Sequence, residues 1–284
     1  MTTREGLAGH VERWFAALPG GDVAALPLAP DVRVTENGEE IAPGEGVWGA
    51  TTAVTGPLQH PVADPELGQV VSWALVEEDG PTILGVRLRV RDEQIDQIEM
   101  LACRPRRQVE GGLLHAPGLM RTRPVLAEPV PAADREELVA AAHGYLDAIV
   151  AGDAGLVRVT DACLRIENGV QTVRNDGGED LPAGRRDQPY WRMGVAEQVR
   201  SGIFADIEAA ADRRVLAVDT DRGLVALAFR FDHPGPTAAN GFRSRYPEPN
   251  GMVIMEIWKV AGGEIVHVES ILDVFEYGRP PGWD

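Results

Sequence analysis

The chain has 284 residues and a mass of 30.6 kDa, enough for one large domain or two ordinary ones. Its 27 basic and 44 acidic residues give a net charge of −17, which argues against nucleic-acid and anionic-membrane partners. No apolar run approaches the roughly 20 residues of a membrane span, and the N-terminus lacks a signal-peptide core, so we expect a cytoplasmic protein.

The first elements along the chain are helices followed by strands. Residues 11–18 have a helical pattern that a Gly-Asp pair ends, and the strand that follows closes in Glu-Asn-Gly at 36–38, a tight-turn signal. Further strands are predicted at 70–78 and on both sides of a turn within 83–101. Helices followed by an antiparallel meander indicate the α+β class.

The second part of the chain repeats this order. Residues 7–38 align without a gap on residues 138–169, at an offset of 131, and both copies contain the Glu-Asn-Gly turn. The closing strand pairs, 83–101 and 252–272, match at an offset of 170, so the second copy carries about 39 extra residues between its ends. Additional strands of the second copy are predicted at 213–220 and 224–233.

The repeat defines the domain boundaries that we expect. A proline-rich linker without helical periodicity, residues 105–131, separates an N-terminal domain (1–104) from a C-terminal domain (132–284), and we expect it to pack along the surface without regular structure. Strand 252–259 is largely apolar on both faces, so both faces of its sheet are expected to be covered. The sister domain is the obvious cover, which predicts an internal pseudo-dimer.

These motifs resemble the SnoaL-like, nuclear-transport-factor-2-like superfamily. The resemblance rests on the helices, the Glu-Asn-Gly turn and the closing hairpin with Ile-x-x-x-Glu. An uncharacterised SnoaL-like family of bacteria and fungi is resembled more closely by four segments: RRVLAVDTDRGLVALAFRFDHPG, IMEIWKVAGGEIVHVESIL, EYGRPPGWD and HPVADPELGQVV. The resemblance implies two cone-shaped α+β barrels in tandem, each with a pocket at its wide end, paired through their outer sheet faces. Catalytic residues differ between families of this superfamily, so no role is carried over.

Three residues of the C-terminal domain are candidate catalytic groups. Glu256 shares a strand face with Ile254 and Trp258, where burial would raise its pKa and suit acid/base chemistry; an interdomain salt bridge is the alternative. His233 ends an apolar strand face at an expected pocket rim, or it is a structural histidine. Tyr145 lies on the helix that faces the cone interior in the resembled superfamily, where it could donate to an oxyanion or simply pack in the core.

A competing site is predicted in the N-terminal domain. His60 and Asp64 stand four apart in a loop, the arrangement of a histidine base with its orienting carboxylate; an Asx turn beside a surface imidazole is the alternative. Glu99 and Glu269 occupy equivalent places in the two copies and are more simply architectural. Lys259 is the only lysine and therefore the only candidate for Schiff-base chemistry, although a solvated strand end is the simpler expectation.

Aromatic and arginine side chains of the C-terminal domain are candidates for holding a ligand. Two segments, residues 187–194 and 240–251, are predicted to be loops that close over the ligand. Their arginines could hold an acidic or phenolic group, or they are simply solvated. The candidate substrate-binding residues are Tyr190, Trp191, Arg192, Trp258, Phe231 and Arg245.

The sequence contains none of the nucleotide, zinc or serine-hydrolase motifs, and its histidines are scattered, so we expect no cofactor and no metal. Two functions remain open. The first is a cofactor-independent acid/base enzyme of lyase, isomerase, dehydratase or cyclase type, less readily a hydrolase, acting on a small, largely apolar aromatic, polyketide or terpenoid molecule. The second is a non-catalytic ligand-binding or scaffold protein. A monomeric pseudo-dimer or a homo-oligomer fits either function.

Overall fold

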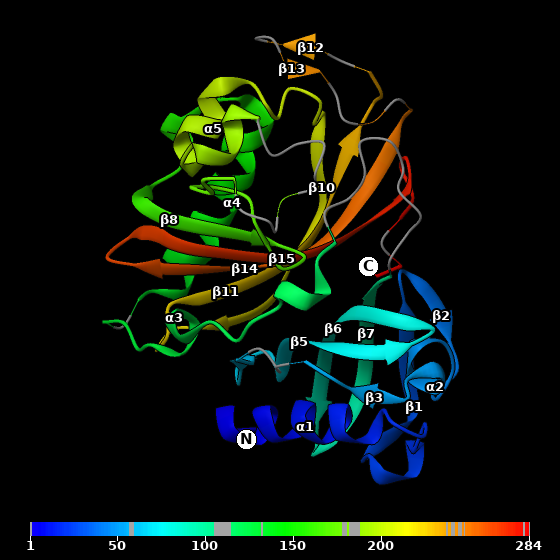
Figure 1. Cartoon of the computed structure of the whole chain (residues 1–284). Coiled ribbons are helices and arrows are strands. Elements are labelled where there is room, and N and C mark those ends of the chain that lie inside the picture. Colours follow the sequence, from blue (N-terminus) through cyan, green and yellow to red (C-terminus); the bar gives the residue numbers. More distant parts are fainter. Residues whose placement is uncertain are drawn as a thin grey trace.

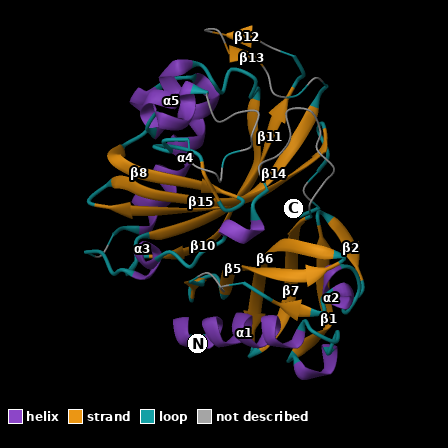
Figure 2. Ribbon diagram, viewed as in Figure 1, coloured by secondary structure: helices purple, strands orange, loops and turns teal. Residues whose placement is uncertain are grey.

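The computed structural model of the chain describes residues 2–56, 60–104, 115–131, 133–177, 181, 188–236, 238–239, 242–243, 246, 248–280 and 282–283. Two curved sheets, one from each part of the chain, dominate the molecule (Figures 1 and 2). Helices and antiparallel strands follow one another as expected, which confirms the α+β class. No helix of the described ranges has the length and apolar character to cross a membrane.

The N-terminal sheet has the strand order β2-β1-β7-β6-β5-β3, with β4 also paired to β5. Helix α1 lies against this sheet and is capped at its N-terminus by Thr3, whose side chain accepts a hydrogen bond from the amide of Gly6. The elements are α1 (Arg4–Ala17), a 3-10 turn (Val23–Ala25), β1 (Leu28–Glu36), β2 (Glu39–Ile41), α2 (Val47–Ala50), β3 (Ala53–Val54), β4 (Val62–Asp64), β5 (Gln69–Glu78), β6 (Gly80–Arg91) and β7 (Gln94–Cys103).

The C-terminal sheet has the order β9-β8-β15-β14-β11-β10, the same order of first strand, closing hairpin and meander. Helices α4 and α5 cover one face of it (Figure 1). The elements are α4 (Arg135–Ala151), 3-10 turns (Ala154–Leu156 and Pro189–Arg192), β8 (Val159–Glu167), β9 (Val170–Gln171), α5 (Val195–Ser201), β10 (Ala209–Asp219), β11 (Leu224–His233), β14 (Asn250–Ala261), β15 (Glu264–Glu276) and a small ribbon, β12 (Ala238–Ala239) with β13 (Phe242–Arg243).

The Glu-Asn-Gly turns fix the same strand pairing in both sheets. Asn37 and Asn168 have positive φ angles of 51° and 47° and each inserts its side chain into the sheet ladder. The Asn37 amide bonds both backbone groups of Ala102, at 2.8 and 3.2 Å, and the Asn168 amide bonds those of Leu272, at 3.0 and 2.9 Å. Consequently β1 pairs parallel with β7, and β8 with β15, beside the antiparallel strands that the sequence predicts.

The two sheets contact each other through their outer faces. One buried cluster combines side chains of both, among them Trp73 and Leu101 of the N-terminal sheet with Met255 and Ile257 of the C-terminal sheet. The approach is close enough that a Cβ atom on Gly85 would lie 2.2 Å from the side chain of Ile271. The outward face of β14 is therefore covered by the N-terminal sheet, while its inward face lines the C-terminal interior.

The C-terminal segment also crosses back to the N-terminal sheet. The Trp283 indole donates to the Thr35 hydroxyl at 2.7 Å and lies under the guanidinium groups of Arg33 and Arg87, 4.4 and 4.6 Å from the ring centroid. The two halves are thus joined by their sheet faces and by this terminal segment.

The expected linker is more regular than the sequence suggested. Its described part contains a 3-10 turn (Pro117–Leu119) and the one-turn helix α3 (Pro124–Ala127), each starting with the proline that tolerates a first helical position. Residues 105–114 lie outside the described residues, and the domain boundaries stay predictions.

Lys259 is a second correction, because it is buried rather than solvated, with 2% of its surface exposed. Its ammonium group donates to the carbonyls of Glu128 and Arg222 and so holds the linker against the sheet. Burial lowers the pKa of this amine.

Candidate functional site

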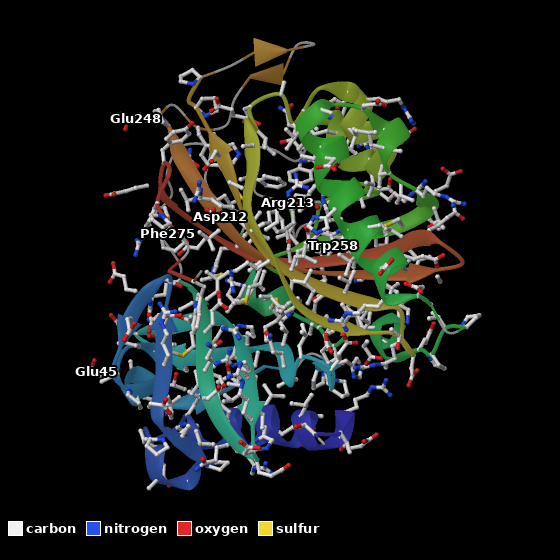
Figure 3. The ribbon with its side chains drawn as sticks, turned by 180° about the vertical axis from the view of Figure 1, so that it is seen from behind. Glu45, Asp212, Arg213, Glu248, Trp258 and Phe275 are labelled. Carbon is white, nitrogen blue, oxygen red and sulfur yellow. The ribbon has the colours of Figure 1, made fainter. Side chains whose placement is uncertain are left out.

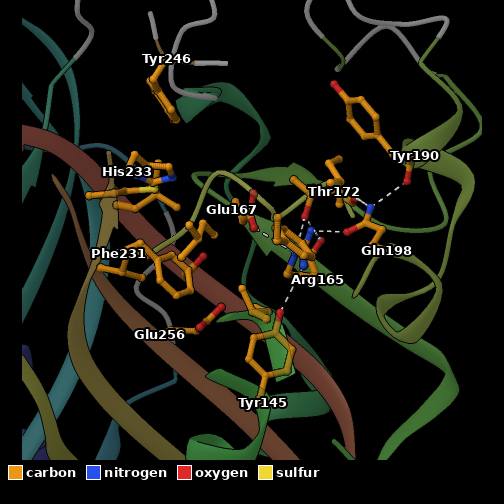
Figure 4. Close-up of a pocket in the computed structure, with 18 of the residues that line it drawn as sticks. Tyr145, Arg165, Glu167, Thr172, Tyr190, Gln198, Phe231, His233, Tyr246 and Glu256 are labelled. Atoms are coloured by element: carbon orange, nitrogen blue, oxygen red, sulfur yellow. Dashed lines mark hydrogen bonds and ion pairs between the residues drawn. The ribbon is translucent and has the colours of Figure 1, made fainter. Parts of the chain in front are cut away.

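A pocket of about 60 Å³ lies between the C-terminal sheet and helices α4 and α5 (Figure 4). Strands β8, β11, β14 and β15 supply one wall, and α4, α5 and the 3-10 turn at Pro189–Arg192 supply the other. Its polar side chains, drawn from five different elements, include Tyr145, Arg165, Glu167, Gln198, His233 and Glu256. The pocket therefore joins groups that are far apart in sequence.

Arg165 of β8 is the centre of the polar side of the pocket, with 4% of its surface exposed. Its guanidinium donates to the Thr172 hydroxyl at 2.9 Å, the Tyr145 hydroxyl at 3.3 Å and the Gln198 amide oxygen at 2.5 Å. Its Nε atom also lies 2.9 Å from a carboxylate oxygen of Glu167. These contacts hold the guanidinium in one orientation and neutralise its charge.

Gln198 is itself held by the backbone of the surrounding loops. Its amide nitrogen donates to the carbonyls of Thr172 and Tyr190, both at 2.7 Å, which directs its amide oxygen to Arg165. Gln198 lies on helix α5, which is capped at its N-terminus by Gly194; the amide of Gly194 donates to the side chain of Glu197 at 2.7 Å.

Glu256 of β14 has 5% of its surface exposed and is directed into the pocket, on the same strand face as Ile254. Burial raises the pKa of this carboxyl to about 8, with a further upward contribution from Glu167 that Arg165 opposes. No residue in the described ranges forms a hydrogen bond with it, and Figure 4 shows its carboxyl extending toward Tyr145. The interdomain salt bridge considered for Glu256 is wrong, because the residue lies on the inner face of the sheet.

Tyr145 and His233 lie on opposite walls of the same pocket. Tyr145 of α4 is 1% exposed, and burial raises the pKa of its phenol above the usual value, so the hydroxyl keeps its proton. His233 ends β11, is also 1% exposed and has its ring 4.8 Å from that of Tyr246. Phe231, two residues earlier on β11, lines the pocket beside it.

The structure separates the other candidate ligand-binding residues. Tyr190 and Trp191 line the pocket, whereas Arg192 is exposed and is not among the lining residues. Trp258, which is labelled in Figure 3, does not line the pocket either. It is fully buried in the hydrophobic core and packs edge-on against Tyr145, with the ring centroids 5.8 Å apart. Arg245 lies outside the described residues.

His60 and Asp64 do not form the predicted pair. Asp64 is 1% exposed and accepts hydrogen bonds from Arg135 of α4 at 2.7 Å and from the Val218 amide of β10 at 2.9 Å, while its other oxygen accepts two amides of its own turn. Its carboxylate therefore anchors the C-terminal half to the N-terminal half. Burial and the nearby Arg222 lower the pKa of His60, outside the pocket.

Glu99 and Glu269 are also held in structural contacts. Glu99 accepts from Arg87 of its own sheet at 2.8 Å and from Arg214 of the other sheet at 2.5 Å. Glu269 lies 3.9 Å from Arg123 of the expected linker and 3.4 Å from His267. Neither lines the pocket.

Sequence reasoning missed Arg165, Glu167, Thr172 and Gln198. One signal could have found the first of them: at the offset of 131, Arg165 stands where the N-terminal copy has the buried residue Val34. A charged side chain on a strand position that is apolar in the other copy indicates that the two interiors differ.

The N-terminal interior is indeed filled at the corresponding positions. Tyr145, Arg165 and Glu256 correspond by the repeat offsets to three buried apolar residues, Trp14, Val34 and Val86. Trp14 packs edge-on against Trp48, with ring centroids 6.1 Å apart. His233 corresponds by strand register to Glu78, which Arg104 bridges to Glu36 at 2.9 and 2.6 Å. The polar pocket therefore belongs to the C-terminal half.

Fold and site together define an α+β protein in which a curved sheet and two helices enclose a buried acid, phenol and guanidinium. The model of one family, described as a domain of unknown function (DUF8021), matches residues 131–272, half of the chain and the half that holds the pocket. The chain belongs to this family. No curated protein matches it.

Several solved structures are similar to about half of the chain. A proposed polyketide cyclase from Xanthomonas campestris pv. campestris is 13% identical, with 50% of this chain and 93% of the other covered and a TM-score of 0.35. A proposed isomerase from Bacillus subtilis is 12% identical, with 48% and 88% covered and a TM-score of 0.33. An NTF-2 like protein of unknown function from Burkholderia xenovorans LB400 is 14% identical, with 52% and 90% covered and a TM-score of 0.28. Similarity at this level carries no activity over to the present chain.

Proposed function

We propose that the protein is a cofactor-independent acid/base enzyme of the lyase or isomerase type, acting on a small, largely apolar molecule in the C-terminal pocket. The observation that carries the proposal is Glu256, a buried carboxyl with a pKa of about 8 that is directed into a cavity. Such a group holds a proton at pH 7 and releases it slightly above, which suits proton transfer in either direction.

The surrounding residues supply the remaining roles. Tyr145 is a protonated phenol held by Arg165, able to donate to an oxygen that gains negative charge during the reaction. His233, on the other wall, is the second proton-transfer group. Arg165 orients the Tyr145 hydroxyl, and because Glu167 neutralises its guanidinium, the Arg165–Glu167 pair adds no net charge to the pocket.

In the same proposal the two halves are copies of one SnoaL-like unit, paired as an internal pseudo-dimer. The matching strand order, the equivalent Asn37 and Asn168 ladders and the shared cluster around Trp73 and Met255 support it. In this proposal the N-terminal half has a structural role and no catalytic one, because its interior is filled by Trp14 and Trp48.

A non-catalytic ligand-binding protein is the second candidate. A scaffold protein is the other non-catalytic form of this candidate, and the modest cavity of about 60 Å³ favours it, because this space holds only a few water molecules before side chains move.

Exchange of carbon-bound hydrogen distinguishes these functions. Small aromatic and alicyclic ketones are incubated with the protein in D2O, and their gain in mass is measured. The proposal predicts exchange that falls roughly 10²-fold or more in Glu256→Gln and in His233→Ala, because each removes a proton-transfer group.

His60→Ala is the matched control, since that histidine lies outside the pocket, and it should exchange at the wild-type rate. Exchange that survives unchanged in folded Glu256→Gln contradicts the assignment. Ligand binding without exchange favours the binding protein.

A further inference from the structure

We propose that the ligand of the C-terminal pocket carries a positively charged amine on a small apolar or aromatic body, and that the amine pairs with Glu256. This inference rests on the proposed function, whose substrate class it names. It is carried by the charges, the rings and the hydrogen bonds of the pocket.

The pocket has more carboxyl groups than guanidinium groups. Among its described lining residues, two carboxyl groups, those of Glu167 and Glu256, accompany one guanidinium, that of Arg165. Glu167 is already paired with Arg165 at 2.9 Å, and Glu256 forms no hydrogen bond within the described residues although it is 95% buried. A cation from outside would therefore supply the missing partner of Glu256.

An anionic ligand finds no equivalent partner. Arg165 already donates to Thr172, Tyr145 and Gln198 and faces Glu167. A carboxylate or phosphate brought into this space would lie beside Glu256, so it would be repelled wherever that group is ionised and would gain no ion pair where the group is protonated.

Aromatic rings surround the same space. Six of the 19 lining residues are aromatic, although aromatic residues make up only 6% of the chain, and three of its four tyrosines are among them. Ring faces attract cations, and they do so more strongly where water is excluded. The rings belong to Tyr145, Tyr190, Trp191, Phe204, Phe231 and Tyr246.

The charge of the whole protein acts in the same direction. A net charge of −17 raises the local concentration of cations and lowers that of anions around the molecule. Pocket charge, ring lining and overall charge thus agree on one class of ligand.

The proton balance of binding provides a direct test. In the empty pocket at pH 7, Glu256 is mostly protonated. An ammonium ion that pairs with it replaces this proton, so the acid and the ammonium ion give an ion pair and one proton released to the buffer. Glu167 raises and Arg165 lowers the pKa of Glu256, and Glu256 in turn raises the pKa values of Tyr145 and Cys163. His233 is a further titratable group of the pocket lining.

The experiment compares three probes with one ring and different head groups: benzylamine, benzyl alcohol and benzoate. Calorimetric titrations at pH 7 in two buffers of different ionisation enthalpy give the affinity and the number of protons released. We expect benzylamine to bind at least tenfold more tightly than benzyl alcohol, to release about one proton, and benzoate to bind most weakly.

Two variants separate charge from ring contributions. Glu256→Gln keeps the side-chain shape and should abolish both the amine preference and the proton release. Phe231→Leu keeps an apolar side chain but removes one ring, and it should weaken benzylamine binding more than benzyl alcohol binding.

Affinity should also respond to pH with a defined sign. Benzylamine binding should strengthen as pH rises toward 8, where Glu256 ionises without help, and should weaken again once the amine loses its own proton. A neutral ligand that accepts a hydrogen bond from the protonated acid would show the opposite slope below pH 8.

Equal or tighter binding of benzyl alcohol or benzoate, benzylamine binding without proton release, or no binding of any probe would each overturn the inference. If the amine preference fails while Glu256→Gln still abolishes hydrogen exchange, the proposed function survives and only the ligand class is wrong. If exchange is unaffected by Glu256→Gln, the proposed function fails as well.

Discussion

The Glu256→Gln variant should be more stable than the wild-type protein at pH 7, by roughly 3 kcal/mol of unfolding free energy, while losing its proton-transfer activity. The reason is linkage: the carboxyl has a pKa of about 8 in the folded protein and 4.5 in its ordinary state, so folding opposes its ionisation. Below pH 4.5 the carboxyl is protonated in both the folded and the unfolded protein and costs no stability. As pH rises from 4.5 to 8, the unfolding free energy of the wild-type protein falls. Glutamine keeps the shape and carries no charge to bury.

Denaturant unfolding of both proteins between pH 4.5 and pH 8 measures this effect. The difference in unfolding free energy should grow steadily with pH in favour of the variant. Glu264→Gln, at the exposed first residue of β15, is the control, and its difference from wild type should stay near zero throughout. A constant or shrinking difference for Glu256→Gln would show that Glu256 is ionised in the folded protein.

The second large effect is expected for Arg165→Met, which should lower the unfolding free energy by roughly 3 kcal/mol. Methionine fills similar space but leaves Glu167 without its cation and removes the donor to Thr172, Tyr145 and Gln198. The variant should also lose activity, because the Tyr145 hydroxyl is no longer held toward the pocket.

Arg192→Met is the matched control, since Arg192 is exposed and does not line the pocket; its unfolding free energy should change by less than about 0.5 kcal/mol. Adding Glu167→Gln to Arg165→Met should restore part of the lost stability, because the unpaired carboxylate is then removed. Equal stability of Arg165→Met and Arg192→Met would mean that the polar cluster is not energetically coupled.

Local sequence patterns predicted those site residues whose position follows from strand alternation. Phe231 and His233 share a face of β11, and Glu256 with Ile254 shares the inner face of β14, so period two placed all of them in the pocket. The same rule wrongly predicts that Trp258 lines the pocket. Strand alternation gives the face on which a side chain lies, but it does not show that Tyr145 packs against Trp258 in the core.

Contacts between distant segments could not be found in this way. Arg165 meets Gln198, 33 positions away and on a helix whose orientation no local pattern encodes. Asp64 was paired with its near neighbour His60, whereas its true partner Arg135 lies 71 positions away across the interface of the two halves. In the sequence, a charged residue of such an interface is easily mistaken for a member of a catalytic pair, because only the fold shows which residue forms its ion pair.

Carbon-13 NMR titration of the glutamate side-chain carboxyls tests most directly whether one glutamate in the C-terminal pocket keeps its proton at neutral pH. We expect one carboxyl resonance with a midpoint near pH 8, absent from the Glu256→Gln spectrum and displaced when Glu167 is changed to glutamine. A wild-type spectrum in which every glutamate carboxyl ionises with a midpoint near the ordinary pKa of 4.5 would contradict it.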